Sequence, residues 1–204
     1  FSDWERPAEK LQNDSAYRER LYAEWAIADT IICPSDYVAQ SLRDEGIASE
    51  KLVVVPYGVA LPVVAEPAYD RRGSRKLRVL FVGTVELRKG VHYLAEALGR
   101  LPKCAIEARI IGSNRLTETG IARLAEVADV VGRVPRSEIA EQFAWADVFV
   151  LPSLVEGSAT VTYEALSHGL PVICTPNTGS IVTDGETGLI IEPFSAAAIA
   201  DALE

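Results

Sequence analysis

The amino-acid sequence predicts an α/β fold whose larger part is a doubly wound parallel sheet, and three observations predict it. From residue 77 to the end, short runs rich in β-branched residues alternate with segments of helical period. The runs are apolar at nearly every position, which is typical of strands buried on both faces of a parallel sheet. Right-handed crossovers between such strands give a Rossmann-like sandwich of helices around the sheet.

Six strands are expected in this part of the chain. They are the runs RVLFVG, CAIEARIIG, DVVGRV, DVFVLPS, PVICTP and GLIIEP, at residues 78–83, 104–112, 129–134, 147–153, 171–176 and 188–193. Helices are expected at residues 90–101, 118–128, 137–146, 158–169 and 195–204, because their apolar residues recur with helical spacing. Residues 180–185 are expected to form a short turn or helix.

The first part of the chain has too few strands for a sheet of its own. A charged helix at residues 7–28 is followed by a strand in TIICPS, a helix in YVAQSLRDEG and a strand in KLVVVPYGV. Two strands do not make an independently stable sheet. We therefore expect residues 1–62 to be the tail of an upstream α/β domain. Residues 63–76, with clustered charges and a proline, are expected to be a linker, and residues 77–204 a Rossmann-like domain.

The composition disfavours several classes of function. Of the 204 residues 49% are apolar, which is enough for a buried core. The net charge is −9 and no run of five like charges occurs, so we expect no nucleic-acid or anionic-membrane surface. The apolar runs are too short to span a bilayer, and no signal peptide is recognised. Because the chain opens with Phe1 and has no methionine, we expect a piece of a longer protein.

The residue types that bind metals or form disulfides are few and scattered. Cys33, Cys104 and Cys174 each lie in or beside an apolar run and are expected to be buried thiols in a reducing compartment. No Asp-x-Asp and no carboxylate cluster spaced for a metal occurs in the sequence. His92 and His168 fall in predicted helices, where packing or surface roles are expected.

A first candidate site follows the first strand of the predicted sheet, in VGTVELRKG at residues 82–90. Ligands of open parallel sheets bind beyond the carboxyl ends of strands, and helix N-termini offer N–H groups to anions. Gly83 would let a ligand approach the backbone, and Arg88 and Lys89 would place two cations beside a phosphate. Taken alone, a glycine turn followed by two solvated basic side chains explains this segment at least as well.

A second candidate site is the loop and helix of VLPSLVEGSATVTYEALSHGLPVI at residues 150–173. If the helix starts near Ser158, Glu156 lies just ahead of its N-terminus and Glu164 lies one to two turns inside it. Both carboxylates can then flank one cleft and accept hydrogen bonds from sugar hydroxyls. The spacing alone fits slightly better a Glu156 that compensates the helix dipole and a Glu164 on the helix surface.

Taken together, the two segments resemble the retaining glycosyltransferases of the GT-B fold, family 4, the glycosyl transferases group 1. The resemblance runs through ADTIICPSDYVAQSL, KLVVVPYGV, VLFVGTVELRKGVHYLAEAL, GRVPRSEIAEQFAWADVFVLPSLVEG, YEALSHGLPVICTP and GETGLIIEP, and it covers most of the chain. Glu156 and Glu164 match the E-x7-E pair of that family. The resemblance implies that residues 1–62 end an N-terminal, acceptor-side domain and that residues 77–204 bind a nucleotide sugar.

The resemblance also implies a role for each candidate residue. Arg88 and Lys89 would hold the donor diphosphate and Glu156 would contact the transferred sugar, so these three are the implied catalytic residues. Glu164 would bind the ribose hydroxyls. The other implied donor-binding residues are Gly83 and Thr84 after the first strand, Arg133 and Val134 near the base, and the backbone of Gly157, Ser158, Ala159 and Thr160 near phosphate and sugar.

Two departures from the family pattern bear on the donor. Many members have an arginine directly after the first strand's glycine, where this chain has Thr84, so Arg88 is expected to supply that charge. Members commonly read Gly-Phe-Gly after the first glutamate, whereas this chain reads Gly157-Ser158-Ala159. This difference changes the shape around the sugar, and the identity of the sugar is left open.

The implied activity is transfer of a sugar, with retention, from a UDP-, GDP- or ADP-sugar to a sugar, glycan or lipid-linked acceptor. Neither a metal nor pyridoxal phosphate is expected. The expected partner is the missing N-terminal domain, which would complete the acceptor surface. The chain alone is therefore expected to bind nucleotide weakly without efficient turnover. The expected location is the cytoplasm, with peripheral attachment to the inner face of the membrane through that domain.

Two alternatives to a transferase stay open at this point. One is a non-catalytic module that binds nucleotide sugars, and the other is a sugar-nucleotide epimerase of the same architecture. The expectation that cations and diol-binding carboxylates lie on opposite sides of one cleft favours transfer over both, because a catalytically dead copy has no need for that arrangement.

Overall fold

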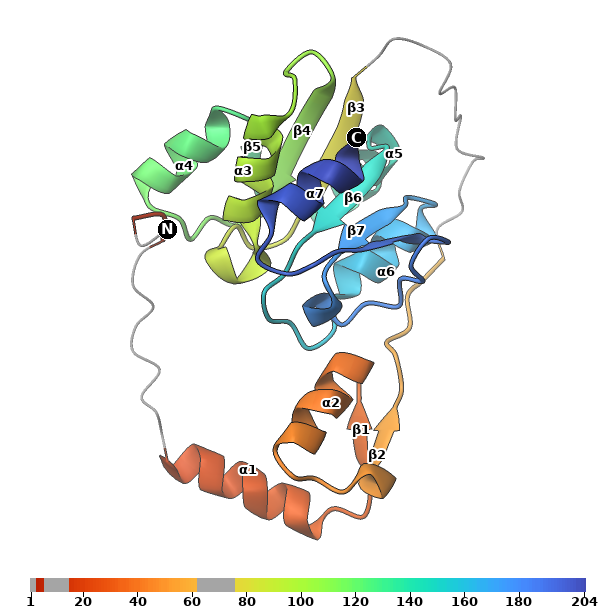
Figure 1. Ribbon diagram of the computed structural model, residues 1–204. Helices are drawn as coiled ribbons and strands as arrows, with labels where there is room; N and C mark the ends of the chain where they lie inside the picture. The colour runs from red at the N-terminus through yellow and green to blue at the C-terminus, as the bar shows by residue number, and fades with distance from the viewer. Residues whose placement is uncertain (1–2, 6–14, 62–75) are drawn as a thin grey trace.

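The computed structural model describes residues 3–5, 15–61 and 76–204, and its larger part is a six-stranded parallel sheet (Figure 1). In spatial order the strands are β5 (Asp129–Gly132), β4 (Ile106–Ile111), β3 (Leu77–Val82), β6 (Val148–Leu151), β7 (Val172–Cys174) and β8 (Gly188–Ile190). Every neighbouring pair is parallel. This arrangement confirms the predicted fold class and all six predicted strands.

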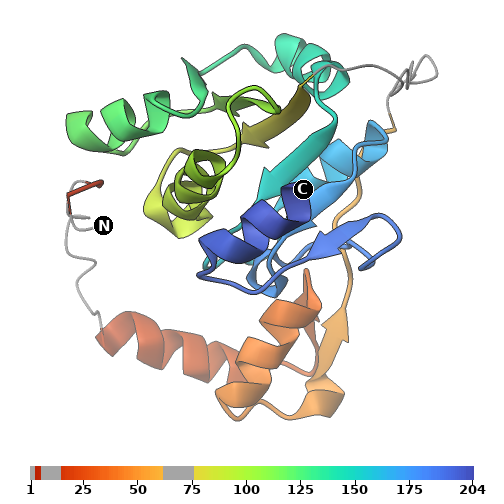
Figure 2. The ribbon, with the colours of Figure 1, turned by 45° about the horizontal axis from the view of Figure 1, so that its top comes forward.

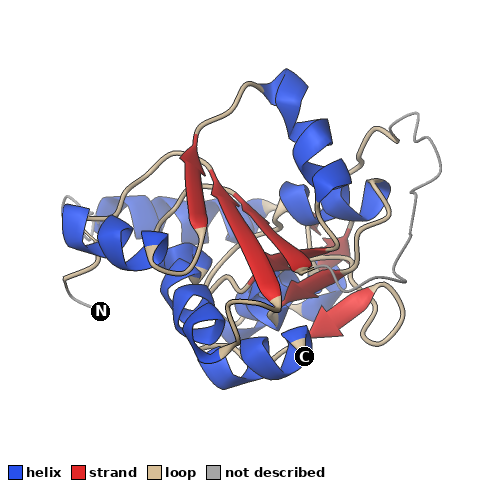
Figure 3. Cartoon of the chain, turned by 90° about the horizontal axis from the view of Figure 1, so that it is seen from above, coloured by secondary structure: helices blue, strands red, loops and turns tan. Residues whose placement is uncertain are grey.

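The strands form from apolar runs because both faces of the sheet are covered. All four residues of β6 are buried, and so are Val79, Leu80 and Phe81 in the middle of β3. Successive side chains of a strand point to opposite faces, so consecutive buried residues require cover on both sides. The helices supply that cover (Figure 3).

Five helices surround this sheet, in the order that the apolar spacing predicts. They are α3 (Val91–Arg100), α4 (Glu118–Ala125), α5 (Ile139–Trp145), α6 (Thr160–Ser167) and α7 (Ala196–Leu203). Helices α3 and α7 pack side by side over one face (Figure 2), while α6 packs on β6 and β7 and α5 contacts β3. Residues 180–185 form no helix, and Asp184 pairs with Gly188 in an isolated bridge.

The chain reverses direction across the sheet between β3 and β6. From β3 it moves outward to β4 and β5, and from β6 it moves outward on the other side to β7 and β8. Such a reversal is a topological switch point, and the loops that leave the two central strands part there. The loop after β3 and the loop after β6 leave these neighbouring parallel strands at the same carboxyl edge of the sheet.

The upstream residues form a small unit with its own core. It consists of α1 (Ser15–Ile27), β1 (Ile31–Cys33), α2 (Asp36–Asp44), the 3-10 turn η1 (Ser49–Lys51) and β2 (Leu52–Val54). Strands β1 and β2 are parallel, and Ala39 and Leu42 of α2 pack with Cys33 of β1 in a small buried cluster. The elements stand in the predicted order. The domain boundaries stay a prediction, because residues 6–14 and 62–75, which hold the start of the predicted first helix and most of the linker, lie outside the described residues.

This small unit touches the larger one beyond the carboxyl ends of the strands (Figure 1). Ser35 caps α2 by accepting from the Val38 N–H, and its hydroxyl donates to the Gly157 carbonyl at 2.6 Å. Residues 3–5 make a second contact, where Trp4 is buried and its carbonyl accepts from the Thr117 N–H at 2.7 Å. The upstream chain thus contacts both the loop after β6 and the start of α4.

The burial of the cysteines corrects one expectation. Cys33 and Cys174 are buried as predicted, and burial raises the pKa of both thiols, that of Cys174 to about 11. Cys104 is exposed, because it lies in the turn between α3 and β4 and the strand starts only at Ile106. Over the described ranges, no helix is both long and apolar enough to cross a membrane.

Candidate functional site

The loop after β3 owes its position to a glycine. It runs through the 3-10 turn η2 (Leu87–Lys89) to Gly90, which has φ 73° and starts α3. A Cβ at Gly90 would lie 2.0 Å from the Pro152 carbonyl oxygen. The neighbouring Arg88 carbonyl accepts from the Leu154 N–H at 2.8 Å. Glycine at position 90 therefore allows the loop after β3 to dock on the loop after β6.

This docking brings Arg88, Lys89 and Glu156 together at the switch point. Glu156 Oε2 accepts from Arg88 Nη1 at 2.9 Å and forms an ion pair with Lys89 Nζ. The Lys89 and Glu156 side chains are 12% and 18% exposed, and that of Arg88 is 47% exposed. We expected the cations and the diol-binding carboxylates on opposite sides of one cleft. For Glu156 this expectation is wrong, because the docked loops bring its carboxylate into ion pairs with both Arg88 and Lys89.

A second carboxylate holds the other end of the Arg88 guanidinium. Glu86 Oε1 accepts from Arg88 Nη2 at 2.7 Å, and Glu86 Oε2 lies 3.7 Å from Arg115 Nε. Burial opposes the charged form of Arg88, but the nearby Glu156 and Glu86 carboxylates outweigh it and raise the pKa of Arg88 above its usual value. Sequence reasoning missed Glu86, since nothing in the polar turn indicates that this one side chain is buried.

The loop after β6 leads into α6, which begins at Thr160, two residues later than the predicted Ser158. Its N-cap is Ala159, which has no side-chain acceptor for the first-turn N–H groups. The Ala159 N–H already donates to the Thr178 carbonyl at 3.2 Å, and Ser158 Oγ donates to the Gly179 carbonyl at 3.0 Å. These bonds, with the bond from Ser35 to Gly157, fix the backbone between Glu156 and α6.

A cleft of about 450 Å³ opens at the carboxyl edge between the sheet, α5 and α6. Three predicted donor-binding residues line it: Arg133 and Val134 after β5, and Glu164 on α6. Glu164 Oε1 lies 3.4 Å from Nη2 of Arg136, which is itself nearly fully exposed. The other lining residues are Arg136 itself and Val59, Ala60, Val82, Ile139, Ala140, Phe143, Ser167 and His168. Apolar walls with a few convergent polar groups are typical of sites for small organic ligands.

Gly83 and Thr84 follow β3 beside this cleft, where Val82 contributes to the lining. The Gly83 N–H donates to the Ile111 carbonyl at 2.9 Å. A Cβ at Gly112, which has φ 147°, would lie 1.7 Å from the Gly83 carbonyl oxygen. Sequence reasoning did not single out Gly112, although a glycine at the end of the predicted strand is a signal that could have found it.

Both histidines pack, as predicted. His168 caps the end of α6, with Nδ1 2.8 Å from the Glu164 carbonyl, and its ring stacks on Phe143 at 4.8 Å between centroids. His92 is buried in α3, and burial lowers its pKa to about 4. Among the residues with described positions, no group of three or more His, Cys, Asp or Glu side chains could hold a metal ion.

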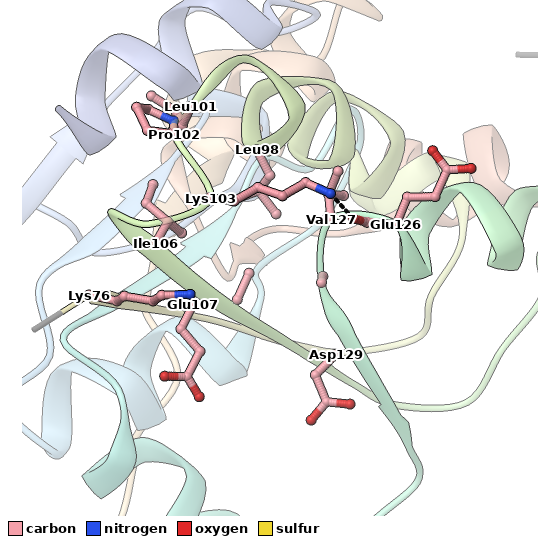
Figure 4. Close-up of a pocket in the computed structure, with 12 residues that line it drawn as sticks. Lys76, Leu98, Leu101, Pro102, Lys103, Ile106, Glu107, Glu126, Val127 and Asp129 are labelled. Carbon is pink, nitrogen blue, oxygen red and sulfur yellow. Dashed lines mark hydrogen bonds between the residues drawn. The ribbon is translucent and has the colours of Figure 1, made fainter.

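A second hollow of about 260 Å³ lies at the opposite, amino-terminal edge of the sheet (Figure 4). Leu98, Ile106 and Val127 form its apolar floor, and charged side chains stand around it. One of them, Lys103, donates to the Glu126 carbonyl at 3.3 Å. None of the predicted site residues lines this hollow. Since ligands of doubly wound sheets bind at the carboxyl edge, the candidate site is the cleft and ion-pair cluster at the switch point.

These features define a doubly wound α/β protein with a cation cluster at its switch point and a cleft at the same carboxyl edge of the sheet. Residues 76–204 match the family described as Glycosyl transferases group 1, and the chain belongs to this family. A D-inositol 3-phosphate glycosyltransferase of Paenarthrobacter aurescens is 34% identical in an alignment of 181 positions that covers 78% of this chain and 44% of that protein. The putative teichuronic acid biosynthesis glycosyltransferase TuaC of Bacillus subtilis is 36% identical over 61% of this chain and 31% of its own length.

Solved structures share the fold of this chain. Anabaena HepE in complex with UDP superimposes with a TM-score of 0.75 at 18% identity, over 98% of this chain and 59% of that one. Sucrose-phosphate synthase from Thermosynechococcus elongatus gives a TM-score of 0.72 at 27% identity, over 97% of this chain and 54% of that one. The chain spans about half the length, or less, of the curated relatives described above.

Proposed function

We propose that this chain is the donor-binding part of a retaining glycosyltransferase, which moves a sugar from a nucleoside-diphosphate sugar to an acceptor hydroxyl. The observation that carries the proposal is the meeting of Arg88, Lys89 and Glu156 at the switch point, at the same edge of the sheet as the cleft that contains Glu164. Two cations suit a diphosphate, and a cleft with apolar walls and a carboxylate suits a nucleoside. The family and the UDP complex of a similar structure support the same assignment.

Each part of the donor has a proposed place in this site. Arg88 and Lys89 bind the diphosphate and stabilise the charge that develops on it when its bond to the sugar breaks. Glu164 accepts hydrogen bonds from the ribose hydroxyls, and Glu156 contacts the transferred sugar. The remaining proposed contacts are Arg133 and Val134 with the base, Gly83 and Thr84 beside the diphosphate, and the backbone of Gly157, Ser158, Ala159 and Thr160 with phosphate and sugar.

The ion pairs of Glu156 give donor binding a specific consequence. A diphosphate and the Glu156 carboxylate compete for the same groups, Arg88 Nη1 and Lys89 Nζ. The diphosphate carries the larger negative charge and can engage both cations through several oxygens. We expect it to replace the carboxylate, after which Glu156 is released to contact the sugar.

The acceptor site requires more chain than the described unit provides. In the two-stranded sheet of β1 and β2, the paired residues Ile32 and Val53 point away from α2 and are 69% and 45% exposed. A parallel sheet is normally covered on both faces, so this apolar face is suited to further strands and helices of an upstream domain. We expect that domain to bind the sugar, glycan or lipid-linked acceptor.

The finer assignments of the proposal concern donor, cofactor and location. The donor is a UDP-, GDP- or ADP-sugar, and the reaction needs neither a metal nor pyridoxal phosphate, since arginine, lysine and N–H groups neutralise the leaving diphosphate. The protein works in the cytoplasm and attaches to the inner face of the membrane through the upstream domain. These assignments rest on the family resemblance and on the residues of the site.

The test is a thermal-shift titration of the purified chain with UDP-, GDP- and ADP-sugars. A donor at 100 times its Kd should stabilise the fold by about 2.7 kcal/mol. Lys89→Ala should abolish most of this shift and should lower transfer by the complete enzyme by about two orders of magnitude or more. Lys103→Ala, in the hollow at the other edge of the sheet, is the matched control and should change neither.

Three outcomes would contradict the proposal. If none of the three nucleotide sugars shifted the melting temperature, the site would not be a donor site. Donor binding without transfer by the complete enzyme would indicate a non-catalytic module. Formation of a changed sugar in the absence of any acceptor would indicate an epimerase.

A further inference from the structure

We propose that Glu86 is a positioning residue that holds the Arg88 guanidinium in place while the donor diphosphate displaces Glu156. This inference rests on the proposed function and goes beyond it, because Glu86 belongs to none of the roles assigned above. Glu86 stands at the N-cap of η2, two residues before Arg88, and its side chain is 8% exposed. A buried carboxylate beside an anion-binding cluster needs a physical reason, since it repels the ligand.

The two ends of the Arg88 guanidinium have different partners. Nη2 donates to Glu86 at 2.7 Å, while Nη1 donates to Glu156 and to the Val155 carbonyl, both at 2.9 Å. A guanidinium is planar and its N–H directions are fixed relative to one another. Fixing Nη2 on Glu86 therefore aims Nη1 toward the position that Glu156 holds in the structure.

The two carboxylates also differ in how easily a diphosphate can replace them. Glu86 is the more buried, and removing its partner would leave a buried charge without compensation, which is costly. Its other cation, Arg115, is 3.7 Å away with a side chain 68% exposed. Glu156 is more accessible and lies on the loop after β6. Exchange with an anion therefore occurs at Glu156, while Glu86 keeps its bond to Arg88.

The backbone around Glu86 is held on several sides, as a fixed support requires. The Glu86 carbonyl accepts from the Lys89 N–H at 3.1 Å, and the Val85 N–H donates to the Ser113 carbonyl at 2.8 Å. The Leu87 N–H donates to Glu5 Oε2 at 2.7 Å. The last two bonds tie the loop to the segment that follows β4 and to the upstream residue Glu5, so the Glu86 carboxylate has a defined position from which to orient Arg88.

The experiment measures UDP binding to the purified chain by calorimetry, with folding of each variant checked by its melting temperature. Glu86→Ala removes the acceptor for Nη2 and should raise the Kd by about tenfold. Glu86→Gln keeps an oxygen in the same place and should stay within about threefold of the wild type. If Glu86 acted only through its charge, the Kd for UDP would fall in both variants, because each removes a negative charge beside the diphosphate site. Tighter or unchanged binding by Glu86→Ala would overturn the inference.

A double-mutant cycle with Arg88→Ala separates positioning from general support of the fold. If Glu86 acts through Arg88, Glu86→Ala should cost about tenfold in the wild-type background and less than about twofold when Arg88 is already alanine. An equal loss in both backgrounds would overturn the inference. Arg115→Ala is the control and should change the Kd by less than about threefold, because that pair is long and exposed.

A second variant keeps the test decisive if Glu86→Ala does not fold. Arg88→Lys retains the charge and leaves Glu86 in place, but an ammonium cannot hold Glu86 and a phosphate through two fixed directions. It should weaken UDP binding by about fivefold or more, and wild-type affinity would overturn the inference. If the wild-type chain bound none of UDP, GDP and ADP, the proposed donor site itself would fail, and the role of Glu86 with it. Normal binding that is unaffected by Glu86 would refute this inference alone.

Discussion

Replacing Glu156 by glutamine should strengthen the binding of free UDP while it weakens sugar transfer. Glu156 pairs with Arg88 and Lys89, the two cations proposed to bind the diphosphate. If the proposal is right, the diphosphate must break both ion pairs in the wild type before it binds. Glutamine keeps the size of the side chain but removes its charge. The variant therefore removes the competitor and leaves both cations in place.

The size of this effect follows from the exposure of the pairs. The pair with Lys89 is the better shielded, with side chains 12% and 18% exposed, and the pair with Arg88 is closer to solvent. Ion pairs of this kind contribute about 0.5–1 kcal/mol each, so the two together oppose UDP by about 1–2 kcal/mol. The Kd for UDP should accordingly fall by about 5- to 30-fold. Transfer should fall by about 100-fold, because Glu156 no longer contacts the sugar as a carboxylate.

Calorimetric titration of the purified chain with UDP measures the first effect, and the initial rate of the complete enzyme measures the second. Glu164→Gln is the matched control with the opposite expected sign. The Glu164 carboxylate lies in the cleft, and its ion-pair partner at 3.4 Å is an exposed arginine that is not one of the two diphosphate-binding cations. Removing its charge therefore frees no cation for the diphosphate. The amide of Glu164→Gln should bind the ribose hydroxyls less well, so the Kd for UDP should rise. A Kd for UDP that is unchanged or higher in Glu156→Gln would refute the competition between carboxylate and diphosphate.

Three further predictions concern the fold and its titratable groups. Gly90→Ala should destabilise the chain by more than about 3 kcal/mol in urea unfolding, because its Cβ would meet a backbone carbonyl at 2.0 Å. Gly99→Ala, in the same helix with 3.8 Å to the nearest atom, should stabilise it by about 0.5–1 kcal/mol, and equal effects would contradict the argument. At pH 8 a thiol reagent should add once per native chain by mass spectrometry, at the exposed Cys104, since burial raises the pKa of Cys174 to about 11; two adducts would be contrary to this. The pKa of His92 is lowered to about 4, so the unfolded chain binds a proton that the folded chain does not, and unfolding free energy should fall by about 2 kcal/mol from pH 7 to pH 5. His92→Gln should remove that dependence, and an unchanged slope would sink the assignment.

The order of the strands and helices was predictable because it depends on local pattern. The run DVFVLPS is apolar at successive positions, which is typical of a strand covered on both faces. The strand formed by this run, β6, is buried throughout. The helical spacing of GVHYLAEALGRL likewise predicts α3, whose buried residues include Val91, Leu94 and Leu98. The first and last residues of each element were less predictable, because the ends of helices and strands depend on contacts with other segments. Cys104 lies before the strand that was expected to contain it, and α6 starts two residues later than expected.

The candidate site could be predicted only as a set of residues. Motif order selected Arg88, Lys89, Glu156 and Glu164, but spacing along the chain could not tell which of them touch. Glu156 pairs with two residues nearly seventy positions away in the sequence, while Glu164, in the same motif, lies in the neighbouring cleft. Which of the two glutamates contacts the cations depends on how the loops after β3 and β6 dock.

By itself the sequence determined the six-stranded α/β architecture, because burial on two faces and helical period leave their marks in local composition. It also supplied the residue types of the proposed donor site. Only the tertiary structure decided that Glu156 lies on the two cations and that Glu86, in an unremarkable polar turn, is buried behind Arg88. The physical reason is that burial and ion pairing of a polar side chain are set by what packs against it. Here that partner is a loop from the other side of the switch point, which no local pattern describes.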